Sequence, residues 1–298
     1  MHEQNNLRLI VGIATAGRRE VLSNTLQQIA HQQALPDRVV VCPASDEDFD
    51  LSVITKLPYP VEVVRGARGL TAQRNLILSK STESDFIVFF DDDFYPAYDF
   101  LAKTIDCFQF SPDLVAITGK VIADGTLGPG ISHSEALKIL AADVSTQSPT
   151  LTTVYNAYGC NMAFRMASIV KAKILFDENL PLYSWLEDVD FSRALSANGK
   201  IELNDSLRGV HLATKRGRTS GLRFGYSQIA NPLYLVNKGT FSRWRALQQI
   251  CRNVIANLVH ARSPEPWVDR RGRLKGNFIA FNDALRGQLH PRRILALD

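Results

Sequence analysis

The sequence contains little cysteine and lacks long apolar runs. Its four cysteines, Cys42, Cys107, Cys160 and Cys251, are far apart and lack the spacing of metal ligands. We therefore expect reduced and mostly buried thiols. No apolar run reaches the roughly 18 residues that a membrane-spanning helix needs. Because the first six residues also do not read as a signal peptide, we expect a cytoplasmic protein, with the inner face of the cell membrane as an alternative location.

Acidic residues are scarce in the last third of the chain. Residues 207–298 hold 17 of the 34 Lys and Arg residues but only 4 of the 30 Asp and Glu residues, which is a net charge of +13. The rest of the chain has a net charge of −9. This asymmetry predicts an acidic domain over residues 1–215 and a basic, mainly helical extension over residues 216–298. The basic part favours contact with phosphates or an anionic surface.

Short apolar segments alternate with amphipathic ones over the first 120 residues. Strands are predicted at residues 7–13, 38–42, 61–64, 85–90 and 114–118, and helices after residues 18 and 69. This alternation predicts an α/β fold with a mostly parallel sheet flanked by helices. Ligands bind such sheets beyond the carboxyl ends of the strands, where Thr15, Arg18, Ser45 and Asp46 are expected. Residues 120–158 read as a long irregular excursion.

A run of three carboxylates, Asp91-Asp92-Asp93, follows the apolar strand predicted at residues 85–90. Adjacent like charges repel one another unless a cation or hydrogen-bond donors compensate them. Hard oxygen ligands at the end of a strand suit Mg²⁺ or Mn²⁺ carrying a diphosphate. The alternative is a helix start, since Pro96 fits a first helical position and acids before it favour the helix dipole. One Asp would suffice for that role, so we favour the metal.

Two further sets of polar residues suit a phosphorylated ligand. Arg74 and Asn75 lie early in the helix that follows Gly69, and a helix start can hold a phosphate. Arg216 and Arg218 could clamp a diphosphate on a loop, because guanidinium groups pair bidentately with phosphate oxygens. The alternative for both arginines is a solvated basic loop.

The order of motifs resembles the family 2 glycosyltransferases, which are inverting enzymes of the Rossmann-like GT-A fold. The resemblance covers residues 7–215 and is closest to the bacterial exopolysaccharide and lipopolysaccharide type. It implies a nucleotide-binding part at about residues 1–120 and an acceptor part at about 121–215. The motifs that carry it are Thr15 with Arg18, Gly69 to Asn75, Asp91 to Asp93, Gly159 to Arg165, Trp185 to Asp190, and His211.

The resemblance implies a metal-dependent transfer from a nucleotide-diphosphate sugar. Asp93 would bind Mg²⁺ or Mn²⁺ with Asp91 and His211, and Asp91 and Asp92 would also contact the donor. Other implied donor contacts are Thr15, Arg18, Ser45, Asp46, Arg74, Asn75, Arg216 and Arg218. The usual acid directly after the second strand is missing, since only Ser45 and Asp46 follow Cys42-Pro43-Ala44. We expect a UDP-sugar, with GDP or dTDP as alternatives.

The resemblance also implies a general base. Asp188 would take the proton of the acceptor hydroxyl, and the adjacent Glu187 would raise its pKa or bind the acceptor. The alternative for this segment is a helix first turn, which is compatible with catalysis. Asn161 and Trp185 would contact the sugar or the acceptor, although Asn161 also suits a structural amide. The product would carry a β-glycosidic bond on a glycan or a lipid-linked glycan.

Residues 241–262 predict a basic amphipathic helix. Its apolar face contains Trp244, Leu247, Cys251, Val254, Ile255 and Leu258. Such a helix can lie on an anionic membrane, which would suit a polyprenyl-diphosphate-linked acceptor. The alternative is a helix packed on the domain. Two other functions stay open, namely metal-dependent phosphoryl or nucleotidyl transfer and a non-catalytic membrane- or RNA-binding protein. No aromatic-basic strand pattern supports a nucleic-acid partner.

Overall fold

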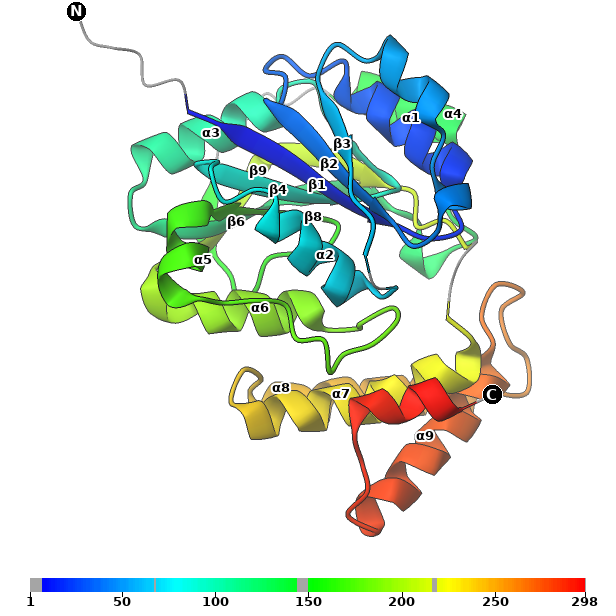
Figure 1. The fold of residues 1–298 in the computed structure, drawn as a ribbon. Coiled ribbons are helices and arrows are strands. Elements are labelled where there is room, and N and C mark those ends of the chain that lie inside the picture. Colours follow the sequence, from blue (N-terminus) through cyan, green and yellow to red (C-terminus); the bar gives the residue numbers. More distant parts are fainter. Residues whose placement is uncertain (1–6, 67, 144–149, 216–218, 298) are drawn as a thin grey trace, which may run out of the picture.

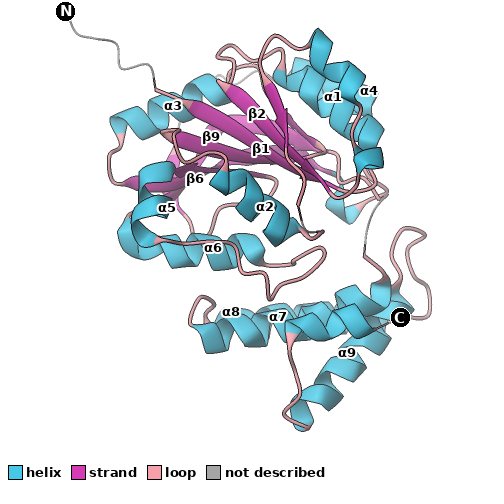
Figure 2. Cartoon of the chain, viewed as in Figure 1, coloured by secondary structure: helices cyan, strands magenta, loops and turns pink. Residues whose placement is uncertain are grey.

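The strands of the described residues form one sheet of nine strands (Figures 1 and 2). The computed structural model describes residues 7–66, 68–143, 150–215 and 219–297. Along the sheet the order is β3-β2-β1-β4-β8-β6-β9-β5, with β7 beside β9. The strands are β1 (Leu9–Thr15), β2 (Arg38–Pro43), β3 (Val61–Val63), β4 (Phe86–Asp91), β5 (Phe94–Pro96), β6 (Leu114–Asp124), β7 (Leu151–Thr153), β8 (Asn161–Arg165) and β9 (Lys200–His211).

The predicted α/β fold is confirmed, and its sheet is mixed beyond the first four strands. β1 to β4 are parallel to one another, as the alternation of strands and helices predicts. β8 runs antiparallel to both β4 and β6, and β5 and β7 run antiparallel to β9. Asn161 at the start of β8 pairs with Phe90 near the end of β4. The chain therefore enters β8 at the edge where β4 ends, and this reverses the direction of the strand.

Helices cover both faces of the sheet, and a separate layer of helices follows (Figure 1). The described α-helices are α1 (Arg19–Ile29), α2 (Leu70–Ser79), α3 (Phe100–Phe110), α4 (His133–Ala142), α5 (Met166–Ala172), α6 (Glu187–Leu195), α7 (Gly221–Lys238), α8 (Arg243–His260) and α9 (Arg270–Leu285). Figure 2 shows the strands confined to the upper part and only helices in the C-terminal layer. We call residues 219–297 the C-terminal extension, and its helical character confirms the prediction.

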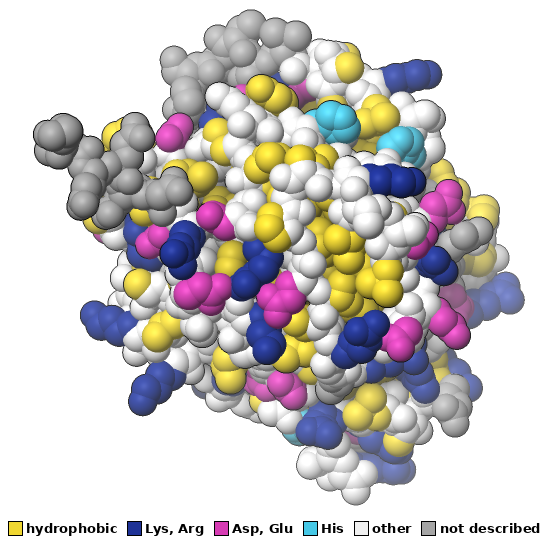
Figure 3. Space-filling model, turned by 45° about the horizontal axis from the view of Figure 1, so that its top comes forward, with side chains coloured by type: hydrophobic (Ala, Val, Ile, Leu, Met, Phe, Trp, Pro, Cys, Tyr) yellow, Lys and Arg dark blue, Asp and Glu magenta, His cyan; other side chains and the backbone are white. Residues whose placement is uncertain are grey.

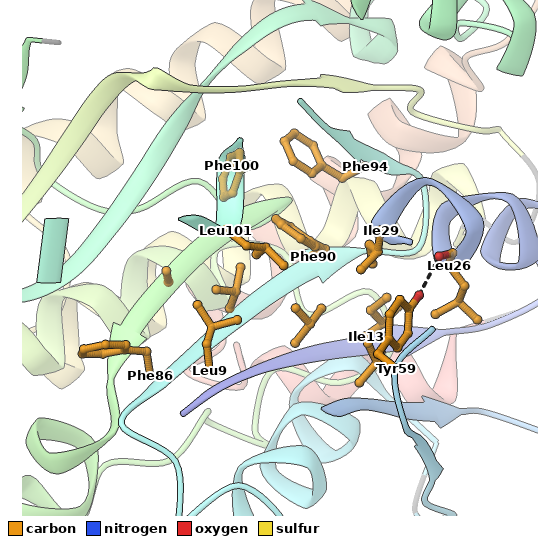
Figure 4. Close-up of a cluster of buried hydrophobic side chains, with 14 of the residues drawn as sticks. Leu9, Ile13, Leu26, Ile29, Tyr59, Phe86, Phe90, Phe94, Phe100 and Leu101 are labelled. Carbon is orange, nitrogen blue, oxygen red and sulfur yellow. Dashed lines mark hydrogen bonds between the residues drawn. The ribbon is translucent and has the colours of Figure 1, made fainter. Parts of the chain in front are cut away.

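Alternating side chains of the strands build two cores, one on each face of the sheet. On β4, Phe86, Val88 and Phe90 point toward α1 and α3, whereas Ile87 and Phe89 point toward α2, α5 and α6. This two-residue period is the expected geometry of a strand that is buried on both faces. Figure 4 shows the first core, in which the rings of Phe90, Phe94 and Phe100 lie together. The end of β4 is therefore held rigidly, and the acidic run begins there.

The alternative interpretation of the acidic run, a helix that starts at Pro96, is wrong. Phe94–Pro96 form the short strand β5, and α3 begins at Phe100. β5 pairs with β9, which places Phe94 opposite His211 and Pro96 opposite Gly209. Tertiary pairing thus overrides the local preference of proline for a first helical turn. The predicted irregular excursion over residues 120–158 also contains regular structure, namely the end of β6, the helix α4 and the strand β7.

The C-terminal extension is fastened to the sheet domain beside α6. The ammonium of Lys238 lies 2.7 Å from both Asp177 and Asp190, and Asp190 also accepts a hydrogen bond from Thr240. The boundary predicted after residue 215 adjoins residues 216–218, which lie outside the described chain. Within the described helices, none combines the length and apolar character needed to cross a membrane. The four cysteines are free, and Cys251 is exposed on α8.

We expect the Lys238→Met variant to lower the free energy of unfolding by about 1–3 kcal/mol, because it leaves the buried carboxylate of Asp190 short of a partner. Urea denaturation would measure this loss.

The same variant should change how stability depends on pH. Burial alone would raise the pKa of Asp177, but Lys238 and the backbone N–H of Asn179 hold it below its usual value. The stabilisation that Asp177 contributes is thus fully present above the ordinary Asp pKa. It is lost as the pH falls through the lower pKa that Asp177 has in the folded state. A deficit that stayed constant into acid would contradict the role of Asp177.

Candidate active site

Asp91, Asp93 and His211 form one cluster at the end of β4. Each offers a ligand atom, and these atoms lie within 4.8 Å of one another. His211 Nε2 is 3.4 Å from Asp93 Oδ1 and 3.9 Å from Asp91 Oδ2. The pairing of β5 with β9 creates this contact, because His211 ends β9 directly beside the strand that follows the acids. Residues 118 positions apart in the sequence therefore meet at the edge of the sheet.

The donor set fits a hard divalent cation. Asp93 Oδ1 is buried and accepts no hydrogen bond within the described residues. Asp93 Oδ2 accepts hydrogen bonds from the backbone N–H of Thr214 at 2.8 Å and from Arg18 at 3.1 Å. A buried carboxylate oxygen without a donor is costly unless something else satisfies it. Two carboxylates and an imidazole supply oxygen and nitrogen ligands that suit Mn²⁺ or Mg²⁺.

His211 is held by a second carboxylate on its other side. Its Nδ1 lies 3.1 Å from Asp124 Oδ1, and Tyr158 donates its hydroxyl to Asp124 Oδ2 at 2.9 Å. Burial alone would lower the pKa of His211, but Asp124 and Asp93 outweigh burial and raise it to about 10. A carboxylate behind a metal-binding histidine orients the ring and leaves the other nitrogen for the metal. Sequence reasoning missed Asp124, which ends β6 and lies beyond the strand predicted at residues 114–118.

Asp92 is 4% exposed and contacts Thr15 and Arg18 rather than His211. Its carboxylate accepts hydrogen bonds from Thr15 Oγ1 at 2.6 Å and from Arg18 at 2.8 Å. Burial raises the pKa of Asp92, although Arg18 opposes this shift. Arg18 thus contacts both Asp92 and Asp93 and lies beside the backbone carbonyl of Thr214. The structure places Asp92 where it holds Thr15 and Arg18, and a direct donor contact for Asp92 stays a prediction.

A second acidic pair, Glu187 and Asp188, begins α6. The preceding loop contains three residues in the left-handed region, namely Leu182 (φ 60°), Ser184 (φ 53°) and Leu186 (φ 74°). Such conformations are strained for residues other than glycine and persist only where neighbours enforce them. Here the carbonyl of Leu182 accepts a hydrogen bond from Leu70 at the start of α2, and that of Trp185 accepts one from Asn231 of α7. The strained loop fixes the direction in which the two acids point.

Arg74 joins the two acidic clusters. It is 1% exposed, and its guanidinium contacts Glu187, Asp91 at 3.1 Å and the carbonyl of Gly159 at 2.9 Å. The ring of Phe89 lies 5.5 Å from the guanidinium carbon. A buried cation between two carboxylates is stabilising only while both pairs remain. Arg74 is therefore a buried residue that fixes the positions of Glu187 and Asp91 relative to each other.

We expect the Arg74→Met variant to lower the free energy of unfolding by about 3 kcal/mol, because it leaves Glu187 buried without its cation. Denaturant unfolding followed by circular dichroism would measure the loss. The matched control is Arg19→Met, which removes an arginine that is 55% exposed and pairs with Asp50 at the surface. A control that loses as much stability as Arg74→Met would contradict the assigned role.

Asp188 is the more accessible of the two acids. Its carboxylate accepts hydrogen bonds from the backbone N–H groups of Val189 at 2.8 Å and Gly159 at 3.1 Å. It is half-buried, whereas Glu187 is 6% exposed and pairs with Arg74. Burial raises the pKa of Asp188 above its usual value, against the effect of these N–H groups. A carboxylate with a raised pKa, partly open to solvent, suits a general base.

A cleft lies beside the first cluster, between the sheet and the start of α7. Its walls include predicted residues at the ends of β1 and β4 and several that the sequence reasoning missed. The missed residues are Arg68, Gln73, Tyr183, Ser220 and Arg223, and the predicted ones are Thr15, Arg18, Asp91 and Asp92. Ser220 caps α7 by accepting a hydrogen bond from the N–H of Arg223. The start of a helix favours anions, so one wall of the cleft suits phosphates.

Three other predicted donor contacts, Ser45, Asp46 and Asn75, do not line this cleft. Asp46 is exposed and pairs with Arg65, and the side chain of Ser45 donates to Asp48. Asp48 is a buried acid that the sequence reasoning missed, and it also accepts the N–H of Gly17 at 2.6 Å. The amide of Asn75 contacts Phe176 and Glu178, away from the acids. Arg216 and Arg218 lie outside the described residues.

The two residues predicted to contact the sugar or the acceptor differ in their surroundings. Asn161 is fully buried, and its Oδ1 accepts hydrogen bonds from Thr118 Oγ1 at 2.6 Å and from Gly119 N at 2.9 Å. This is the arrangement expected of a structural amide. Trp185 is partly exposed, and its ring packs edge-on against Phe224 of α7. It lies within the strained loop before the acids, and its contact with the acceptor stays a prediction.

The comparisons with known proteins agree with this architecture. Residues 10–171, more than half of the chain, match the model described as glycosyl transferase family 2. No curated protein matches the chain. The S. aureus TarS 1–349 structure in complex with UDP-GlcNAc has a TM-score of 0.57 and 17% identity, and the match covers 98% of this chain and 84% of that one.

Two further solved structures share the fold. A longer S. aureus TarS structure has a TM-score of 0.52 and 18% identity, and the match covers 87% of this chain and only 44% of that one. The structure of GalNAc-T7 with UDP, GalNAc and Mn²⁺ has a TM-score of 0.57 and 12% identity, covering 94% of this chain and 57% of that one. At these identities the likeness shows the fold alone. Together with the family model, it shows that the chain belongs to glycosyl transferase family 2 and has the GT-A fold.

Proposed function

We propose that this glycosyltransferase is inverting and uses a UDP-sugar donor. Its acceptor is the hydroxyl of a glycan or a polyprenyl-diphosphate-linked glycan in bacterial surface polysaccharide synthesis. The observation that carries the proposal is the pairing of a partly exposed Asp188 with a buried Glu187, tied through Arg74 to Asp91. One carboxylate is thereby held as a structural anion, and its neighbour is left to accept a proton. These two different roles of Glu187 and Asp188 suit a general base that lies beside the site of the departing diphosphate.

The proposed reaction proceeds in one displacement. Asp188 takes the proton of the acceptor hydroxyl while that oxygen forms a bond to the anomeric carbon. The bond from this carbon to the diphosphate oxygen breaks, and the nucleoside diphosphate leaves with the electron pair. An α-linked donor therefore gives a β-linked product. A divalent cation, Mg²⁺ or Mn²⁺, held by Asp91, Asp93 and His211 would supply Lewis-acid neutralisation of the leaving charge.

Cationic side chains of the cleft support the binding of a diphosphate. Arg18, Arg68 and Arg223 approach the cleft from three different segments, and the capped start of α7 adds the positive end of a helix. Support for uridine comes from two solved proteins of the same fold, S. aureus TarS with UDP-GlcNAc and GalNAc-T7 with UDP. The loop of residues 44–48 after β2 would contact the base, with Asp48 bracing it against Gly17.

A thermal-shift screen of UDP-, GDP- and dTDP-sugars with and without Mn²⁺ tests the donor. We expect UDP-sugars to raise the Tm, and to do so only when the metal is present. Nuclear magnetic resonance of the product would show a β-anomeric configuration. A shift with GDP-sugars alone would contradict the assigned base, and an α-linked product would contradict inversion.

A further inference from the structure

The helix α8 presents most of its large apolar side chains to solvent. Five of them are 51–68% exposed, namely Trp244, Leu247, Ile255, Leu258 and Val259. Their spacing places them on one side of the helix. The buried side consists of Ala246, Ile250 and Asn257 instead. Most of the apolar face that the sequence predicts for this helix therefore points outward and is not used in packing.

The helix α9 repeats this arrangement. Phe278 is 76% exposed and Leu285 is 90% exposed, and Phe281 between them is 43% exposed. The buried residues of α9 are small or polar, namely Gly276, Asn277, Ala280 and Asp283. Trp267 lies in the connection between α8 and α9 and is 36% exposed. Two of the three tryptophans of the chain thus lie at the surface of the C-terminal extension.

The three long helices of the extension contact one another through a hydrophobic cluster, which includes Tyr226, Ile229 and Ile250, and through buried side-chain amides. The amide of Asn257 donates to Gln228 and to Asn277, each at 2.8 Å, and Asn277 donates to the carbonyl of Gly225 at 2.7 Å. A Cβ atom at Gly276 would lie 2.1 Å from the carbonyl oxygen of Leu222, so α7 and α9 approach closely there. The extension therefore has a core of its own, and the exposed apolar side chains of α8 and α9 lie outside that core.

The charges on these helices favour an anionic partner. The helix α8 contains no acidic residue, and the single acid of α9, Asp283, is buried against Tyr226. Arg271 and Lys275 are exposed at positions that share a face with Phe278. Figure 3 shows dark blue Lys and Arg side chains among yellow hydrophobic ones over the lower part of the molecule. A second copy of this chain would bring the same cations face to face, which costs free energy.

We propose that the exposed faces of α8 and α9 dock the enzyme onto an anionic lipid bilayer. Trp244 and the apolar residues beside it enter the interfacial layer, and Arg252, Arg271 and Lys275 contact lipid phosphates. This inference deepens the proposed function, since a polyprenyl-diphosphate-linked acceptor resides in a membrane. It also assigns the partner of the extension independently of the sugar that is transferred.

Vesicle co-sedimentation at low salt tests the docking surface. We expect the wild-type protein to bind vesicles of phosphatidylcholine and phosphatidylglycerol, and not vesicles of phosphatidylcholine alone. The double variants Trp244→Ser with Val259→Ser and Arg252→Glu with Lys275→Glu should each lower binding by about tenfold or more. The matched controls are Phe110→Ser, whose ring is 79% exposed on α3, and Lys138→Glu with Lys171→Glu on α4 and α5. These controls should bind as the wild type does.

Donor hydrolysis separates this proposal from the proposed function. All these variants should hydrolyse a UDP-sugar at the wild-type rate, because the substituted positions are exposed and outside the cleft. A wild-type protein that hydrolyses the donor but does not bind anionic vesicles would overturn the docking surface alone. So would a wild-type dimer in analytical ultracentrifugation that the Trp244→Ser, Val259→Ser variant dissociates, since the face would then bind a second copy.

Discussion

The Asp188→Asn variant is expected to lower kcat for sugar transfer by about 10³-fold. An amide has nearly the size of the carboxylate but cannot take the proton of the acceptor hydroxyl. Donor binding should remain unchanged, because the carboxylate of Asp188 is engaged with the N–H groups of Val189 and Gly159 and lies outside the donor cleft. Steady-state kinetics with a saturating UDP-sugar, together with calorimetric titration of UDP, would measure both properties.

Two comparisons make this experiment decisive. Asp113→Asn removes a carboxylate that is 56% exposed and pairs with Lys200, and it should leave kcat unchanged. Glu187→Gln should lower the stability as well as the activity, because it breaks the buried pair with Arg74. Full activity in Asp188→Asn together with inactivity in a folded Glu187→Gln variant would move the base to Glu187.

The Asp93→Asn variant is expected to lower kcat by about 10³-fold and to weaken Mn²⁺ binding. Asp93 Oδ1 is a buried carboxylate oxygen without a hydrogen-bond donor in the described chain, and its neighbours Asp91 and His211 would complete the ligand set. Electron paramagnetic resonance of free Mn²⁺ would give the affinity without relying on catalysis. Chelation of the wild-type protein with EDTA should abolish transfer, and added Mn²⁺ should restore it.

Asp92→Asn is the matched variant for this test. Asp92 is the adjacent acid, but its oxygens accept from Thr15 and Arg18 rather than facing His211. We expect this variant to bind Mn²⁺ nearly as the wild type does while unfolding at a lower Tm. Equal Mn²⁺ affinity in Asp93→Asn and the wild type would refute the assignment of Asp93 as a ligand.

Local sequence patterns suffice for the first half of the sheet and for the helices α1, α2 and α8. The apolar run before Asp91 forms a strand that is buried on both faces, and the apolar period after residue 18 forms the helix α1. Both patterns depend on residues that are close together in the sequence. Local patterns do not predict the structure at Pro96, because it pairs with Gly209, which lies more than a hundred residues further along the chain. The reversal of β8 is missed for the same reason, because strand direction depends on where the chain enters the sheet.

The candidate site likewise contains some residues that local patterns indicate and others that they do not. The type and order of residues indicate a cation at Asp91 and Asp93, whereas the resemblance to a family, not spacing, suggests His211 and Asp188. No local pattern indicates that Arg74 is buried between two acidic clusters. The contribution of Arg223 to the donor cleft is also hidden, although Ser220 before an apolar run is a recognisable helix start.

The helix α7 belongs both to the donor cleft and to the C-terminal extension. It begins at the cleft wall near Ser220 and continues for 18 residues, which is about 27 Å of helix. Asn231 and Lys238 fasten it to the loop before α6 and to Asp190. The extension therefore cannot rotate as an independent body without breaking these bonds. We therefore expect the donor to enter and the nucleotide to leave through local rearrangements beside the cleft, without a large hinged opening of the molecule.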